Sequence, residues 1–193
     1  MADDYFERQN SRDCVLHSFN NAFGRPAIKK EQVLERIDRM ATELEDRLRS
    51  QGDLSEDEIS NRIKKMRMRS SSGKTFFSAD VVWDTAQELG VFYARVPIPG
   101  TATPFLRLDR LTEPCRQRPM VVLGEINKGT HAIAIRNNML YDSERKSPVD
   151  LTMENLRKSL SVVYSIYVFV EDESALKEVK MSFIPEFGMS REM

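Results

Sequence analysis

The sequence predicts an α+β domain in which helices come first and an antiparallel sheet follows. Apolar residues recur at helical spacing as far as Leu89, whereas short segments rich in β-branched and aromatic residues dominate from Val91 to Val170. The chain has 193 residues, which is long enough for one well-buried core. We therefore expect one domain over residues 1–170 and a C-terminal tail over residues 171–193.

The helices can be taken in order. The first is expected from Cys14 to Phe23, with Ser11 or Asp13 as its N-terminal cap and Gly24 at its end. A helical arm follows, from Ile28 to about Arg69.

Within the arm, Gln51-Gly52-Asp53 ends one helix, and Ser55 with Glu58 forms a capping box for the next. The apolar stripes of both helices are narrow, so we expect the arm to stand partly away from the core. Residues 70–73 are expected to be a linker, after which Ser78 caps a helix that runs to Leu89.

The second half of the sequence is expected to form a sheet. Asn137-Asn138 indicates a tight turn between two strands, because Asn tolerates a positive φ angle. A short helix is expected from Thr152 to Leu160. The apolar residues after Val170 are expected to dock on the domain or on a partner, and the alternative is a partly disordered tail. The expected strands are Val91–Val96, Met120–Ile126, His131–Ile135, Met139–Asp142 and Val162–Val170.

Composition narrows the functional class. The formal net charge is −1, so nothing in the total indicates a nucleic-acid or membrane partner. The chain has no apolar run as long as a membrane span, and its first residues do not resemble a signal peptide. Two cysteines do not make a disulfide framework and fit a reducing compartment. We expect a monomer that is cytoplasmic, or that is delivered into a host cytosol by a virus or pathogen.

Cys14 is the candidate nucleophile. In the first turn of a helix, a thiol meets the positive end of the helix dipole and unpaired N–H groups, which favour a thiolate. The same N–H groups can stabilise an oxyanion, and Gln9 offers an amide as a second donor. A lone cysteine is more often a small core residue, and the polar run from Gln9 to Asp13 is what favours the catalytic interpretation.

His131 is the candidate general base and acid. It opens an apolar strand, so the alternative is a hydrogen-bonded core histidine. Asp142, on the next strand across the predicted turn, can orient the imidazole and stabilise its cation. The alternatives are that Asp142 is only a residue of a strand-end turn, and that another group such as Asp80 orients the imidazole.

Simpler explanations serve for the other chemistry-bearing residues. His17, Asn20 and Asn21 are expected to be structural, and Cys115 to be incidental. Residues 72–75 look like the end of a phosphate-binding loop, but the required earlier glycine is missing. Two His and two Cys at these spacings do not make a zinc site, and no cofactor is expected.

The opening spacing of Gln9, Cys14, His17 and Asn20-Asn21 resembles that of the Josephin family of deubiquitinating cysteine proteases, which have a papain-like fold. The resemblance covers roughly residues 5–170. Its supporting blocks are Thr75–Val82, the His131 segment and the aromatic-rich strand Tyr164–Val170.

The resemblance implies roles for four residues. Cys14 would be the nucleophile, His131 the base and Gln9 the oxyanion donor. Asp142 would be the third member, although the family usually has Asn there, somewhat further from the histidine. The implied partner is ubiquitin, polyubiquitin or a ubiquitin-like modifier, which the helical arm helps to admit, and the implied reaction is hydrolysis of the isopeptide bond at its C-terminus.

Three alternatives stay open at this stage. The chain could be a peptidase or amidase of the same fold that acts on a different substrate. It could be a transglutaminase, because an amine can intercept a thioester. It could also be a catalytically silent module that binds a modifier through the arm.

Overall fold

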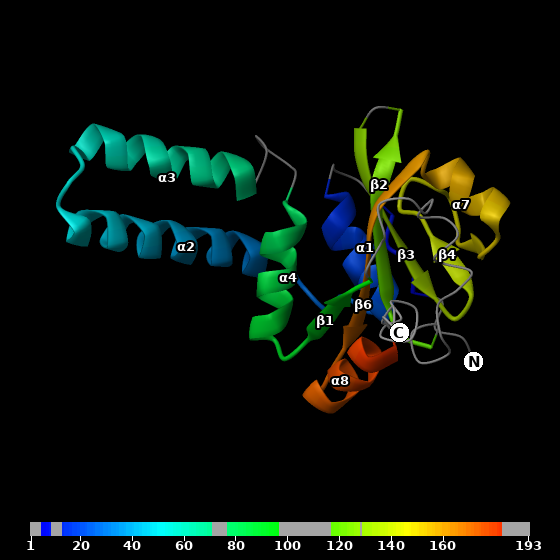
Figure 1. Ribbon diagram of the computed structural model, residues 1–193. Helices are drawn as coiled ribbons and strands as arrows, with labels where there is room; N and C mark the ends of the chain where they lie inside the picture. The colour runs from blue at the N-terminus through cyan, green and yellow to red at the C-terminus, as the bar shows by residue number, and fades with distance from the viewer. Residues whose placement is uncertain (1–4, 9–12, 71–76, 97–116, 128, 183–193) are drawn as a thin grey trace, which may run out of the picture.

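The computed structural model describes residues 5–8, 13–70, 77–96, 117–127 and 129–182. This part of the chain has the predicted α+β architecture, with six helices and one antiparallel sheet of six strands (Figure 1). The helices are α1 (Cys14–Phe23), α2 (Lys30–Gln51), α3 (Glu56–Ser70), α4 (Ala79–Glu88), α7 (Met153–Ser159) and α8 (Glu173–Ser182). The strands are β1 (Phe92–Arg95), β2 (Met120–Ile126), β3 (Gly129–Arg136), β4 (Met139–Tyr141), β5 (Val149–Asp150) and β6 (Val162–Val170).

The strand order is β1-β6-β2-β3-β4-β5, so the long strand β6 is inserted between β1 and β2. Strands β2 and β3 form a hairpin in which Gly124 lies opposite His131. Strand β3 then turns into β4 through Asn137 and Asn138, whose φ angles are 52° and 60°. This confirms the predicted asparagine turn, in which both central residues need positive φ.

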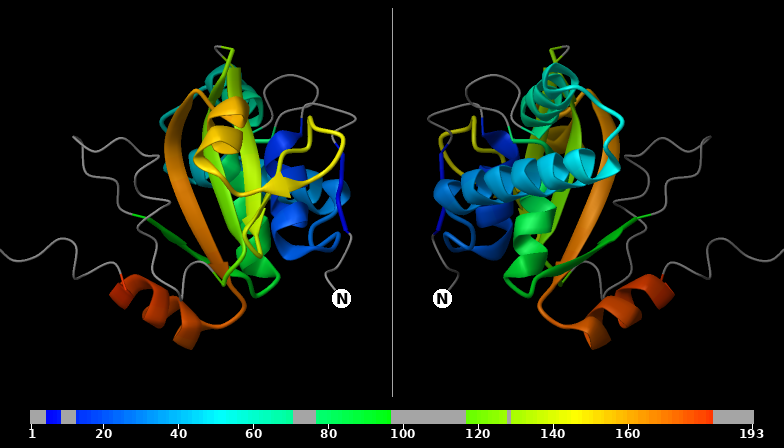
Figure 2. Two further views of the ribbon diagram at one scale, coloured as in Figure 1. Left: turned by 90° about the vertical axis from the view of Figure 1, so that its right-hand side faces the viewer. Right: turned by 90° about the vertical axis from the view of Figure 1, so that its left-hand side faces the viewer.

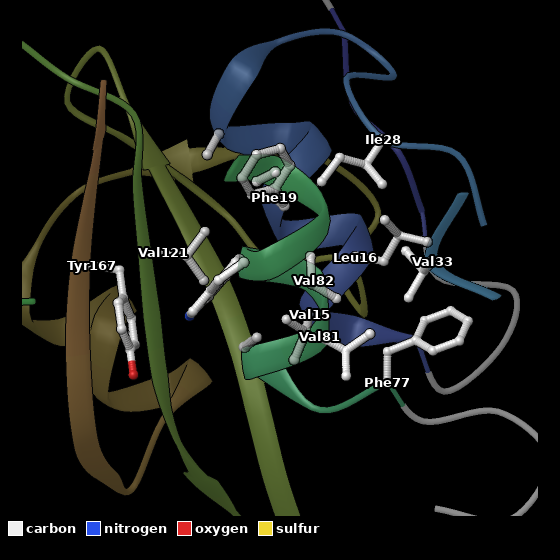
Figure 3. Close-up of a cluster of buried hydrophobic side chains, with 14 of the residues drawn as sticks. Val15, Leu16, Phe19, Ile28, Val33, Phe77, Val81, Val82, Val121 and Tyr167 are labelled. Carbon is white, nitrogen blue, oxygen red and sulfur yellow. The ribbon is translucent and has the colours of Figure 1, made fainter. Parts of the chain in front are cut away.

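Helices cover both faces of the sheet. On one face, α1 and α4 pack on residues that include Val121 and Tyr167 (Figure 3). On the other face, Leu156 of α7 and Val179 of α8 pack against strand residues such as Ile166. Alternation along the strands produces this division, since successive side chains point to opposite faces. The result is a three-layer arrangement with the sheet in the middle.

An aromatic cluster fixes α1 against the sheet. The ring centroid of Phe19 lies 5.8 Å from that of Trp83 on α4 and 5.1 Å from that of Phe169 on β6. Trp83 and Phe169 are themselves in edge contact, with centroids 4.8 Å apart. All three side chains are at most 1% exposed. Because Phe19 belongs to the same helix as Cys14, this packing also sets the position of the helix N-terminus.

The arm formed by α2 and α3 projects away from the sheet, as the narrow apolar stripes predicted (Figure 1). The capping box is confirmed, since the backbone N–H of Ser55 donates to the Glu58 carboxylate at 2.9 Å. Surface ion pairs link the two helices, among them Arg67 with Asp38 at 2.7 Å. The buried residues of α2 are Val33, Ile37, Ala41 and Leu48.

Several local expectations need correction. Asp13 stands at the N-cap position of α1, but its side chain does not cap the helix. Strand β5 was not expected, because its two residues are too few for a pattern. Part of the tail, residues 173–182, forms the helix α8 beside β1 and β6, which was not expected as an element (Figure 2). Its Ala175 and Val179 are buried against the domain, which confirms docking of this part of the tail. In the described part of the chain, no helix combines the length and the apolar character needed to cross a membrane.

Candidate active site

Cys14 is the first residue of α1, and only 4% of it is exposed. It belongs to the same buried cluster as Val15 and Phe19, which hold the helix on the sheet. The N–H groups of the first helical turn have no partner within the helix, so they are available to an anion at this end. The local sequence therefore places the Cys14 thiol at the N-terminus of a helix that is fixed on the sheet.

His131 lies on β3 and is 2% exposed. Its Nε2 is 2.9 Å from Oδ1 of Asp142, and its side chain is also hydrogen-bonded to Cys14. The imidazole thus lies between a thiol and a carboxylate. This is the arrangement of a nucleophile, a base and an orienting acid.

Asp142 directly follows β4 and is 4% exposed. Its Oδ1 accepts a hydrogen bond from the backbone N–H of Glu144 at 3.1 Å, and its Oδ2 lies 3.6 Å from Nε of Arg145. Ser159 of α7 also hydrogen-bonds the Asp142 side chain, and its hydroxyl accepts from Arg145 at 2.9 Å. Asp142 is therefore held from three directions, with its charge directed at His131.

The contacts shift the pKa values of His131 and Asp142 in the directions that favour an ion pair between them. Burial alone would lower the pKa of His131, but hydrogen bonds with Asp142 and Cys14 outweigh it and raise that pKa from 6.5 to about 10. Burial alone would raise the pKa of Asp142, yet hydrogen bonds from His131 and Ser159 hold it below its ordinary value. An imidazolium paired with a carboxylate is thus the stable state at neutral pH.

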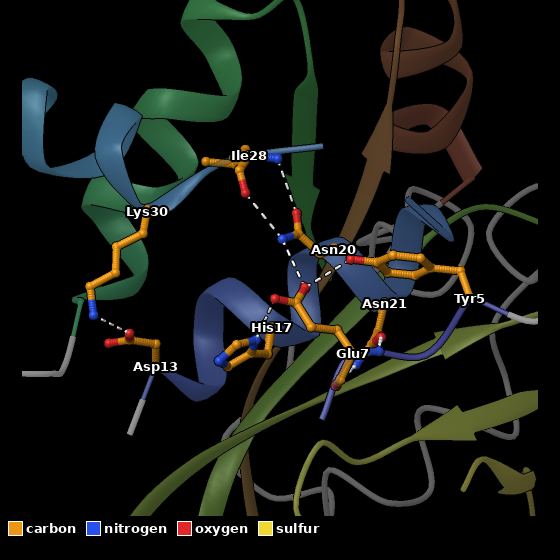
Figure 4. A network of polar contacts seen from close by, with 8 residues as sticks. All are labelled: Tyr5, Glu7, Asp13, His17, Asn20, Asn21, Ile28 and Lys30. Carbon is orange, nitrogen blue, oxygen red and sulfur yellow. Dashed lines mark hydrogen bonds and ion pairs between the residues drawn. The ribbon is translucent and has the colours of Figure 1, made fainter. Parts of the chain in front are cut away.

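A second polar network holds the N-terminal segment against α1 (Figure 4). The Asn21 side chain makes two hydrogen bonds with the backbone of Glu7: it accepts from the N–H at 2.6 Å and donates to the carbonyl oxygen at 3.0 Å. The Glu7 carboxylate pairs with Nδ1 of His17 at 2.9 Å and accepts from Asn20 at 3.0 Å. Asn20 also bonds the backbone of Ile28 in both directions, each at 3.0 Å.

The hydrogen bonds of this network give His17, Asn20 and Asn21 a structural role, in agreement with the expectation. These side chains hold residues 5–8 and the segment that leads into the arm against α1. The pKa of Glu7 is lowered because the hydrogen bonds from His17 and Asn20 outweigh the effect of burial, which alone would raise it.

The predicted site residues can now be placed. Cys14, His131 and Asp142 come together, although they lie far apart in the sequence. Gln9 and Cys115 lie outside the described residues. Asp80 is exposed in the first turn of α4, and the carboxylate beside His131 Nε2 is that of Asp142.

Sequence reasoning missed the residues that hold Asp142. Arg145 comes three residues after Asp142, which is only a weak sign that the two side chains interact. Nothing in the sequence indicates that Ser159 lies near Asp142. Among the described residues, no group of three or more His, Cys, Asp or Glu side chains is placed to hold a metal ion. No model of a known protein family matches the sequence, and a search of curated proteins also gives no match.

Proposed function

We propose that this chain is a cysteine-dependent hydrolase of the papain-like, Josephin-like kind that cleaves the isopeptide bond at the C-terminus of ubiquitin or a ubiquitin-like modifier. One observation carries the proposal: the Cys14 thiol, at a helix N-terminus, is hydrogen-bonded to a buried imidazole whose other side is paired with Asp142 at 2.9 Å. The choice of a modifier as substrate rests on the resemblance of the opening motif and on the projecting arm.

The residues have distinct roles in the proposed reaction. The Cys14 thiolate attacks the carbonyl carbon of the terminal glycine, and the backbone N–H of Cys14, together with the Gln9 amide, stabilises the oxyanion. The imidazolium of His131 gives its proton to the departing lysine amine, and a thioester remains on Cys14. His131, now neutral, takes a proton from water, whose oxygen attacks the thioester. The thiolate leaves and the imidazolium is restored.

Asp142 takes no proton in this scheme. It keeps the imidazole in one orientation and stabilises its positive charge. A carboxylate does this more strongly than the neutral amide usual in the family that the opening motif resembles, which is consistent with the high pKa of His131. The two cysteines of the chain do not make a disulfide framework, which favours a cytoplasmic location, in the cell that makes the protein or in a host cell.

The proposal is tested by intact-mass measurement after incubation with ubiquitin that carries a C-terminal electrophile. A single ubiquitin added to the wild type, and none added to Cys14→Ala, is the expected result. No adduct on folded wild type would refute ubiquitin as substrate, and the same assay with other modifiers would then be applied. Tight modifier binding without any adduct, unaffected by Cys14→Ala, would identify a binding module instead.

A further inference from the structure

Asp13, the residue directly before Cys14, is almost completely buried. Its side chain is 2% exposed, and its Oδ2 pairs with Nζ of Lys30 at 2.8 Å (Figure 4). Lys30 is the first residue of the arm helix α2, and its ammonium group also lies 5.6 Å from the centre of the Phe77 ring. The ion pair therefore joins the root of the arm to the N-terminus of α1.

The position of Asp13 creates an electrostatic conflict. An anion at a helix N-terminus is stabilised by the helix dipole and by free N–H groups. Asp13 stands at the N-cap of α1, and a thiolate on Cys14 would draw on the same positive end. Two adjacent anions in a buried place disfavour each other, unless a cation balances one of them.

We propose that Lys30 is a positioning residue for the nucleophile: it neutralises the Asp13 carboxylate and so leaves the N-terminus of α1 to stabilise a thiolate at Cys14. In this arrangement each anion has its own cation, Lys30 for Asp13 and His131 for Cys14. The inference rests on the proposed role of Cys14 as a nucleophile, but it requires no particular substrate.

The other charged groups considered in the described part of the chain are paired or lie at the surface. His17 pairs with Glu7, and Arg145 pairs with Asp142. Glu144 is exposed, with its Oε1 3.9 Å from Nδ1 of His131. On the neighbouring helix α4, Asp80 is exposed. Lys30 faces Asp13 directly, in an ion pair of hydrogen-bond length.

The test is the pH dependence of Cys14 alkylation by iodoacetamide, measured by intact mass in a Cys115→Ser background. On the acid limb of the profile, the alkylation rate rises with pH. Lys30→Met should shift this rise to higher pH by about one unit, and thus slow alkylation roughly tenfold at a given pH on that limb. Lys30→Arg should restore the wild-type profile, since the positive charge is kept. The matched control is Lys64→Met, which removes an exposed lysine of α3 and should leave the profile unchanged.

The Asp13→Asn variant provides an independent test of the same inference. Alone, it should move the acid limb to lower pH or leave it in place, and combined with Lys30→Met it should cancel the tenfold loss. An unchanged profile in Lys30→Met would overturn the inference. So would a double variant that reacts as slowly as Lys30→Met, or an Asp13→Asn variant that moves the limb upward. The modifier adduct is read separately, so the proposed function can fail while this inference stands.

Discussion

Replacement of Asp142 by Asn is the most direct probe of the charge on His131. The substitution keeps the shape and an acceptor oxygen but removes the negative charge 2.9 Å from Nε2. The contacts of His131 raise its pKa to about 10, and two of the contributions come from Asp142. Because loss of a close opposite charge lowers such a pKa by roughly 1–3, we expect the pKa of His131 in the variant at about 7–9.

The consequence depends on pH. Below about pH 7 the imidazolium persists in the variant, so proton donation to the leaving group is largely kept. Near pH 9 the wild type still has its imidazolium, whereas most of it is lost in the variant. A tenfold change in the acid dissociation constant of His131 corresponds to about 1.4 kcal/mol of interaction between Asp142 and the cation.

The assay needs no natural substrate. Iodoacetate is an anion and iodoacetamide is neutral, so the ratio of their rates with Cys14 rises when His131 is cationic. In a Cys115→Ser background, this ratio should fall near pH 10 for wild type and at about pH 7–9 for Asp142→Asn. A wild-type ratio that falls at the ordinary value of 6.5, or an equal profile for both proteins, would refute the reasoning.

The remaining predictions concern stability, each measured by urea titration. An added Cβ on Gly124 would lie 2.1 Å from the carbonyl oxygen of Val162, so Gly124→Ala should distort the strand beside His131 and lower the free energy of unfolding far more than Gly52→Ala. An added Cβ on Gly52 would meet no atom within 4 Å beyond its chain neighbours, so only the φ angle of 73° is unfavourable, at a cost of about 1 kcal/mol. Trp83→Ala should cost about 3–5 kcal/mol, because it empties the centre of the aromatic cluster. The pKa of His131 is raised on folding, so its stabilisation is complete below pH 6.5 and is lost as pH rises through about 10; the free energy of unfolding should fall over this range in wild type and less in His131→Ala.

Elements with their own periodicity were predictable from the sequence. Helix α1 and the arm helix α2 bury stripes that the spacing of their apolar residues defines. The long strands β2 and β6 are buried on both faces and were predicted from their runs of β-branched and aromatic residues. Strand β5 and the tail helix α8 were not predicted as elements. The first has only two residues, and the second is stabilised by burial of Ala175 and Val179, a tertiary contact that local spacing does not reveal.

The candidate site divides in the same way. His131 and Asp142 were predictable as neighbours because one hairpin joins β3 and β4, and its Asn137-Asn138 turn fixes which residues meet. The packing of α1 on the sheet, a long-range contact, brings Cys14 to these two residues. The sequence indicated this proximity only through a family resemblance. No periodicity places Ser159 near Asp142, since α7 is brought there by the fold as a whole.

The behaviour of Asp13 shows how a correct local pattern can lead to a wrong contact. An aspartate before a helix usually caps it, because the side chain can accept from the first-turn N–H groups. Here the carboxylate instead pairs with Lys30, a residue that the start of the arm brings alongside. If Asp13 capped α1, it would occupy the N–H groups that a thiolate at Cys14 and an oxyanion require. The departure from the local rule thus leaves the helix terminus available to the proposed chemistry, and Lys30→Met together with Asp13→Asn measures what that availability contributes.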